Sequence, residues 1–175
     1  RPKPSPILSL FSFLYKKDNV GFTLQFDDAP SEPIEIAHRT GAPSYKADVN
    51  VNEPNISTLD SGYQLIEVPL EAIAWGRSGD KGNKANIGII ARHPNLLPHI
   101  WDTFSEEKIV EIFSHFLEND KIDRHYLPGI SGVNYVLHDV LGGGGTTSLR
   151  NDPQGKGYAQ ILLSCKISVP KNLLV

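Results

Sequence analysis

Cysteine is almost missing from this sequence, because Cys165 is the only one among 175 residues. One cysteine cannot form an internal disulfide. We therefore expect an intracellular, cytoplasmic protein, since a reducing compartment suits a chain without disulfides. Cys165 itself is expected to be a small buried residue, because no partner for nucleophilic catalysis is evident around it.

Methionine is absent altogether, and the first residue is Arg1. We therefore expect the sequence to be the C-terminal part of a longer protein. Long hydrophobic runs are absent as well. The longest, Ile7–Tyr15, is interrupted by serines and is shorter than the roughly 20 residues that cross a bilayer. Its flanks do not resemble a signal peptide, so we expect no membrane association.

Neither sign of charge is in large excess, because the net charge is only −3. A mildly acidic chain has no general attraction for nucleic acids, so we expect no nucleic-acid partner, although a local anion site is compatible with it. Proline is concentrated at the start, with seven of the 13 prolines in the first 54 residues. This change in composition divides the chain into residues 1–62, an N-terminal arm or the tail of a preceding domain, and residues 63–175, one compact domain.

The spacing of apolar residues predicts the secondary structure. A period of two predicts strands, and a period near 3.6 predicts helices. Strands are expected at residues 7–15, 20–26, 33–37, 66–74, 85–91, 122–127 and 158–169, and helices at 106–117, after an N-cap at Ser105, and 130–141. This order predicts an α+β fold: a two-layer sandwich of a mostly antiparallel sheet with helices on one face, plus an N-terminal β-rich arm.

The stretch 76–88 lies between two predicted strands and is rich in glycine and polar residues. We expect a functional loop there, because glycine permits positive φ and close approach of the backbone to a ligand. Amides and cations in such a loop can hold a carboxylate or phosphate, although the GxxxxGK[ST] pattern is absent. The alternative is an exposed hairpin loop with solvated charges. The candidates are Arg77, Ser78, Lys81 and Asn86 for ligand binding and Asp80 for catalysis.

A second glycine-rich loop is expected over residues 142–157, which begin with four consecutive glycines. Four glycines lose much backbone entropy when they are ordered. The run is therefore either held in place because side chains cannot fit, or it is a flexible linker. Arg150 follows the glycines and is a candidate for anion binding. Lys156 either lines the same site or is solvated.

Asn134 and His138 are four residues apart and would share one face of the predicted helix 130–141. Asn134 is a candidate ligand-binding residue. His138, near the predicted helix C-terminus, is a candidate general acid or base. The alternative is a structural histidine at the edge of the sheet. No metal site is expected, because the six histidines lack HExxH-like or Cys/His spacing.

Two long motifs resemble those of a known family. The first is Arg-Ser-Gly-Asp-Lys-Gly with Ala-Asn-Ile-Gly, within residues 74–88. The second starts with Leu-Pro-Gly at 127–129, continues from Asn134 to four glycines, and is followed by Ser-Leu-Arg and Asp-Pro-Gln-Gly-Lys up to residue 156. In this order they resemble the C-terminal region of the acyclic terpene utilisation (AtuA-type) family, over about residues 65–169.

The resemblance implies a ferredoxin-like domain, a name that describes topology. One cysteine cannot ligate an iron–sulfur cluster, so none is expected, and the cofactor is unknown. The resemblance also implies a role in the catabolism of acyclic terpenes and branched acyl-CoA acids. The domain would help a missing N-terminal domain to form a carboxylate or acyl-CoA site, in a homo-oligomer, as part of a hydrolase or lyase. Two alternatives are a non-catalytic structural or oligomerisation module and a free-standing hydrolase or lyase.

Overall fold

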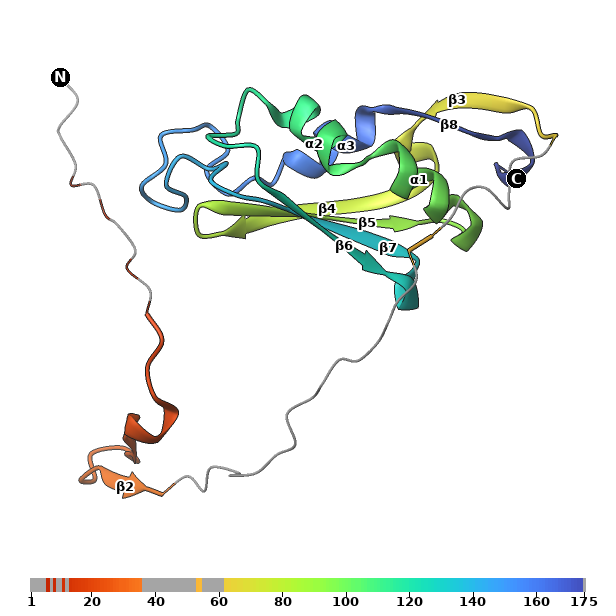
Figure 1. Cartoon of the computed structure of the whole chain (residues 1–175). Helices are drawn as coiled ribbons and strands as arrows, with labels where there is room; N and C mark the ends of the chain where they lie inside the picture. The colour runs from red at the N-terminus through yellow and green to blue at the C-terminus, as the bar shows by residue number, and fades with distance from the viewer. Residues whose placement is uncertain are drawn as a thin grey trace. The chain divides into compact units, whose positions relative to one another are not determined.

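The computed structural model of the protein describes residues 6, 8, 11, 13–35, 53–54 and 62–174 (Figure 1). The chain divides into two compact units, one of Phe11–Asn50 and one of Arg1–Leu10 with Val51–Val175.

The first unit contains one short antiparallel strand pair, β1 (Phe22–Leu24) and β2 (Glu32–Ile34), after the 3-10 turn η1 (Lys17–Asn19). The strands expected at 20–26 and 33–37 are thus shorter than predicted, and residues 36 and 37 lie outside the described residues. The strand expected at 7–15 is wrong for those of its residues that the structure describes. The side chains of β1 and β2 are exposed, so no buried face stabilises a longer pairing.

The second unit contains a four-stranded antiparallel sheet of order β4-β5-β7-β6. Its strands are β4 (Ala74–Lys81), β5 (Lys84–Ala91), β6 (Ile122–Leu127) and β7 (Gly132–Leu137). β4 forms one edge of this sheet and pairs with β5 along its whole length. A two-stranded sheet joins β3 (Leu65–Pro69) to β8 (Lys166–Pro170).

Three α-helices lie on one side of the four-stranded sheet (Figure 1). They are α1 (Leu97–Thr103), α2 (Glu106–Phe113) and α3 (Tyr158–Ser164). The start of α2 is as predicted, because the Ser105 hydroxyl accepts a hydrogen bond from the amide of Lys108. Short 3-10 segments connect the elements: η3 (Leu70–Ala72), η4 (Pro94–Leu96), η5 (Pro128–Ile130) and η6 (Lys171–Leu173). Because η3 interrupts it, the strand predicted at 66–74 is two strands.

The side chains alternate between the two faces of the sheet. On the face toward the helices, Ile87 and Ile89 of β5 and Val133 and Tyr135 of β7 are buried, and the Tyr135 hydroxyl donates a hydrogen bond to the Phe104 carbonyl at 2.8 Å. We call the opposite face the open face. Its side chains include those of Trp75, Arg77, Lys81, Asn86, Ile90, Asp123, His125, Leu127 and Asn134. The open face is thus the part of the sheet on which polar side chains can meet a ligand or a partner.

The element order is related to the βαββαβ order of a ferredoxin-like domain. The first five parts of this order correspond to β5, α1–α2, β6, β7 and α3. In a βαββαβ unit the last strand lies beside the first. Here β4 takes that place, because a two-residue turn joins it to β5, and β8 pairs with β3 instead. The mixed fold with antiparallel sheets therefore agrees with the expected class, while the order of its strands along the chain differs.

The helix predicted at 130–141 is wrong, because this stretch forms β7 in the interior of the sheet. Buried positions alternate along it, as in a strand with one core face. Ser131 and Asp139 bracket the strand with positive φ values, a conformation that does not fit a continuous right-handed helix. His138 therefore does not lie at a helix C-terminus.

The strand predicted at 158–169 is wrong in its first half, which forms α3, while the second half forms β8. Both periods fit the sequence there, because almost every residue of the first half is apolar. Contacts with distant residues favour the helix. The hydroxyl of Ser78 binds the amide of Ala159, and the carboxylate of Asp152 binds the amide of Gly157. These bonds satisfy amides at the helix start that have no partner inside the helix.

Candidate functional site

The glycine-rich stretch 76–88 forms a hairpin and not the loop expected from the sequence. Its strands are joined by Gly82 and Asn83. Gly82 has a φ of 68°, and a positive φ at the first of two turn residues is typical of a type II′ turn, whose twist matches that of paired strands. Because side chains alternate along a strand, Arg77, Lys81 and Asn86 lie on the open face, whereas Ser78 and Asp80 lie on the face toward the helices.

A hollow of about 500 Å³ lies at the β4 edge of the open face, and we call it the cationic hollow. It is lined by Arg77, Ser78, Gly79, Asp80, Lys81, Asn86, Gly88 and Lys156. All five candidates from the stretch 76–88 are among these residues. Lys156 arrives from the segment before α3, and its Nζ would be 3.1 Å from a Cβ atom added at Gly79.

Positive charge dominates the cationic hollow. Arg77, Lys81 and Lys156 line it with a single carboxylate, that of Asp80, whose Oδ1 lies 3.9 Å from the Lys156 Nζ. Lys81 is also directly opposite Lys84 across the hairpin, and like charges on facing strands repel one another. The whole chain carries a net charge of −3, so this excess of cations is local. A bound anion would relieve the repulsion.

Ser78 shapes the cationic hollow from inside the fold. Ser78 is 5% exposed. Its hydroxyl donates a hydrogen bond to the carbonyl of Lys156 at 3.0 Å and accepts one from the amide of Ala159 at 2.9 Å. The single donor of the hydroxyl is therefore engaged within the protein. The two bonds fix the segment that carries Lys156 against β4.

Asn86 and Asn134 meet on the open face. The side-chain amide of Asn86 donates a hydrogen bond to the side-chain oxygen of Asn134 at 3.2 Å, from β5 to β7. Asn134 lies directly opposite Gly88 in the ladder. This candidate therefore joins the others through the pairing of β5 with β7, and not through a helix face as the sequence predicted.

His138 lies apart from the cationic hollow. It follows β7, is 7% exposed, and its Nε2 lies 2.6 Å from Oδ2 of Asp123 on β6. The hydrogen bond from His138 lowers the pKa of the Asp123 carboxyl, because it stabilises the charged form. The positive charges of Lys121 and His125 lower the same pKa further. The two catalytic candidates, Asp80 and His138, do not line the same hollow.

The second glycine-rich stretch contacts the hairpin turn. The carbonyl of Asn83 accepts a hydrogen bond from the amide of Val140 at 3.0 Å, and its side-chain oxygen accepts one from the amide of Gly143 at 2.7 Å. Gly144 has a φ of 70°, and a Cβ atom there would collide with the carbonyl oxygen of Gly82. Of the two alternatives for the glycine run, close packing that excludes side chains therefore applies at this position.

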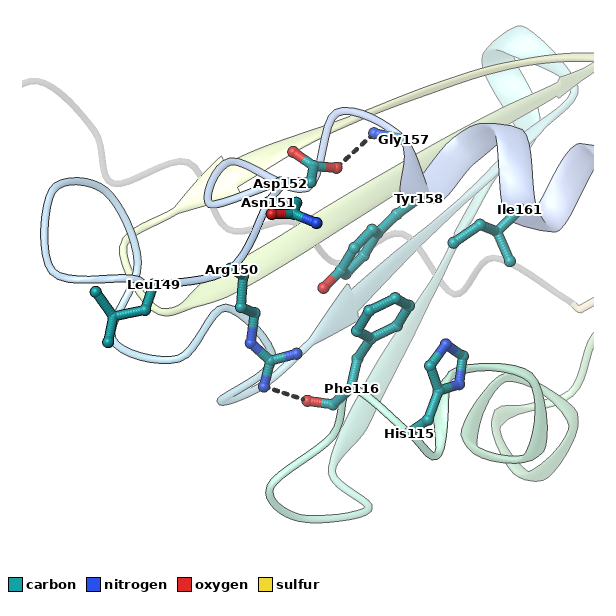
Figure 2. A pocket seen from close by; sticks show the side chains of 9 residues that line it. All are labelled: His115, Phe116, Leu149, Arg150, Asn151, Asp152, Gly157, Tyr158 and Ile161. Carbon is teal, nitrogen blue, oxygen red and sulfur yellow. Dashed lines mark hydrogen bonds between the residues drawn. The ribbon is translucent and has the colours of Figure 1, made fainter.

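Arg150 lines a different hollow, of about 720 Å³, between the chain after α2 and the start of α3 (Figure 2). Its guanidinium group donates a hydrogen bond to the carbonyl of Phe116 at 3.0 Å and lies 5.7 Å from the centre of that ring. The Phe116 ring stacks on Tyr158 at a centroid distance of 4.9 Å. Arg150 thus ties the loop after the glycines to the end of α2. It does not share a hollow with Arg77.

A smaller hollow of about 240 Å³ adjoins the cationic one on the open face, and we call it the apolar hollow. Arg77 and Gly88 line both. The other residues of the apolar hollow are Trp75, Gly76, Ile89, Ile90, Leu127, Ile130, Val133 and Asn134. No role was predicted for Trp75 or Ile90 from the sequence. The available signal was their strand parity, which puts large apolar side chains on the face away from the core.

The part of the chain that the structure describes contains no group of three or more histidine, cysteine, aspartate or glutamate residues arranged to hold a metal ion. None of its helices has the length and apolarity needed to span a bilayer. Cys165 is half-buried, and burial raises the pKa of its thiol, which disfavours the reactive thiolate.

Comparison with known proteins gives one match. Residues 68–168, more than half of the chain, match the family model of the AtuA ferredoxin-like domain. No curated protein and no solved structure matches the chain. The matched range contains all residues that line the cationic and apolar hollows, together with His138 and Arg150.

Proposed function

Because the chain belongs to the AtuA ferredoxin-like family, we propose that it is the part of an acyclic terpene or branched acyl-CoA catabolic protein that helps to bind a carboxylate or acyl-CoA ligand. The cationic hollow carries this proposal, since it sets three cations against one carboxylate. Charge-assisted hydrogen bonds from guanidinium or ammonium to carboxylate are about twice as strong as neutral ones. The volume of about 500 Å³ also lies within the range of about 300–1,000 Å³ usual for small-molecule sites.

Arg77, Lys81 and Lys156 are the anion-binding residues of this proposal. Arg77 can hold a carboxylate in a bidentate manner, whereas the lysines act as point charges. Asn86 offers a neutral polar group, with its amide held by Asn134. Asp80 is the residue of the hollow that we assign to proton transfer.

The remaining candidates support the site from outside the hollow. Ser78 positions the segment that carries Lys156, through the two hydrogen bonds of its hydroxyl. Arg150 holds the loop that leads to this segment. His138, paired with Asp123, is a second group able to exchange a proton, and its place in any reaction depends on what covers the open face.

We also propose that the site is completed by a second domain or a second copy of the chain. The hollow belongs to the open face, over which no helix of the described residues 62–174 lies (Figure 1). In this proposal residues 63–175 are one two-layer domain of a cytoplasmic protein, and residues 1–62 are an arm.

The binding proposal is tested by calorimetry and thermal shift with small carboxylates and acyl-CoA esters. Arg77→Gln combined with Lys81→Gln should reduce affinity at least tenfold, because both cations of the hairpin are lost. Lys171→Gln, which removes one positive charge at an exposed lysine of η6, should leave affinity unchanged. Binding should also weaken as ionic strength rises. No binding of any of these anions, or equal binding by the double variant and the control, would contradict the proposal.

One observation favours a second candidate function, that of a structural or oligomerisation module. Trp75 and Ile130 on the rim of the apolar hollow are 55% and 54% exposed, and exposed apolar groups of this size also occur at protein interfaces. In that case Trp75→Gln should convert a light-scattering mass of two or more chains into that of one. A single-chain mass for the unaltered protein at high concentration would remove this candidate.

A further inference from the structure

Gly88 is a glycine that its own surroundings do not require. It lies inside β5, a strand with partners on both sides, where glycine weakens pairing. It is not among the residues with positive φ. A Cβ atom added there would meet only the Arg77 carbonyl oxygen and the Asn134 side-chain oxygen, both at 3.8 Å, which is ordinary contact.

Two other glycines of the sheet differ in this respect. A Cβ atom at Gly76 would lie 2.8 Å from the Ile89 side chain, and one at Gly132 would lie 2.9 Å from the Ile89 carbonyl oxygen. Packing therefore explains both of these glycines. At Gly88 neither packing nor backbone conformation explains the missing side chain. The remaining explanation is the open space that the missing side chain leaves above the strand.

That space joins the two hollows of the open face. Gly88 and Arg77 line both the cationic and the apolar hollow, and they are directly opposite each other on β5 and β4. A side chain at position 88 would separate the two hollows, because alternate residues of β5, including residue 88, point to the open face. With glycine there, a ligand can lie across the strand and occupy both hollows.

We infer that the ligand of this site is an amphiphilic anion, an acidic head group on an aliphatic chain, and that Gly88 determines this specificity. The inference rests on the proposed function, because the head group would occupy the cationic hollow. The aliphatic chain extends over Gly88 toward Trp75, Ile90 and Leu127. The guanidinium of Arg92 lies 4.6 Å from the centre of the Trp75 ring, and this contact orients the ring that forms the far wall.

The two hollows complement the two ends of such a ligand. The cationic hollow is lined mainly by charged and amide groups. The apolar hollow is lined mainly by hydrocarbon, with Arg77 and Asn134 as its polar side chains besides the Trp75 indole. A short carboxylate would use only the first. A longer one would also remove apolar surface from water, and each seated methylene should increase affinity about fourfold.

In the experiment, the 175-residue protein is titrated with straight-chain carboxylates from propionate to octanoate. Binding is monitored by two-dimensional ¹H–¹⁵N NMR. Affinity of the unaltered protein should rise with chain length, with shifts that spread from Arg77 to Ile90. Gly88→Val should weaken octanoate binding at least tenfold more than it weakens propionate binding. Hexanol, which lacks the acidic group, should bind at least tenfold more weakly than hexanoate.

The Gly88→Val variant is expected to fold, because a β-branched residue favours a strand and the added Cβ atom has no close contact. Its thermal midpoint provides the check, and Gly88→Ala is the smaller change if valine lowers it. Carboxylates that bind without dependence on chain length, or octanoate binding that neither variant alters, would overturn this inference and leave the proposed function standing. If no carboxylate binds the unaltered protein, both fail.

Discussion

Replacing Ser78 with alanine tests the contact between β4 and the segment before α3, on which the position of Lys156 depends. The substitution removes one hydrogen bond of 3.0 Å to the Lys156 carbonyl and one of 2.9 Å from the Ala159 amide. A buried polar group without a partner costs about 1–3 kcal/mol. The Ala159 bond is buried and the Lys156 bond is only partly buried, so we expect a loss of about 2–3 kcal/mol in the free energy of unfolding.

Urea unfolding followed by far-ultraviolet circular dichroism measures this loss as a lower midpoint at an unchanged m-value. Ser164→Ala is the matched control, because it deletes the same hydroxyl from an exposed serine whose bond, to the Ile161 carbonyl, is on the surface. The control should stay within about 0.5 kcal/mol of the unaltered protein. If Ser78→Ala were no more destabilising than Ser164→Ala, Ser78 would not be holding the Lys156 segment.

Two further variants test the loop and the ion pair. Gly144→Ala should lower the free energy of unfolding, measured by urea titration, by at least about 2 kcal/mol, because a side chain there collides with the Gly82 carbonyl. The control is Gly145→Ala, which also has a positive φ but has open space around it. It should lower the free energy of unfolding by only about 1–2 kcal/mol. For Asp123, a folded-state pKa below the ordinary 3.8 adds stability above that pH, and this stability is lost as the pH falls through the lowered pKa. Stability of the unaltered protein should therefore fall more steeply with acidification than that of Asp123→Asn, and parallel pH profiles would contradict the contribution of His138.

The elements that the sequence predicted correctly are those with unambiguous local signals. β5 has apolar residues at alternate positions, with Ile90 the one departure, and α2 has a serine at its N-cap followed by two glutamates. β6 ends at Pro128-Gly129, as expected of a turn signal. In each case the pattern fits only one period, so the tertiary structure had no competing assignment to override.

Two of the misassigned stretches, residues 130–141 and 158–164, have apolar residues that fit both periods. For residues 130–141 the strand was favoured by pairing with β5, whose paired residues lie 42 to 52 positions earlier in the chain. For residues 158–164 the helix was favoured by hydrogen bonds from Ser78 and Asp152 to its first amides. Neither kind of partner can be identified from local periodicity, because each depends on how distant segments meet.

The same distinction between local and distant information applies to the site. Arg77, Lys81 and Asn86 line one hollow because a hairpin brings alternate residues of two adjoining strands to one face, so their convergence follows from a stretch of the chain that can be read locally. Arg150 was grouped with them only by its residue type, and the fold directs it to Phe116 instead. Gly88 illustrates the reverse case. The residue is visible in the sequence, but only its neighbours in the structure show that neither a turn nor close packing requires a glycine there. If an amphiphilic anion lies above Gly88, as we infer, the cations on one side and the apolar side chains on the other would bind its two ends.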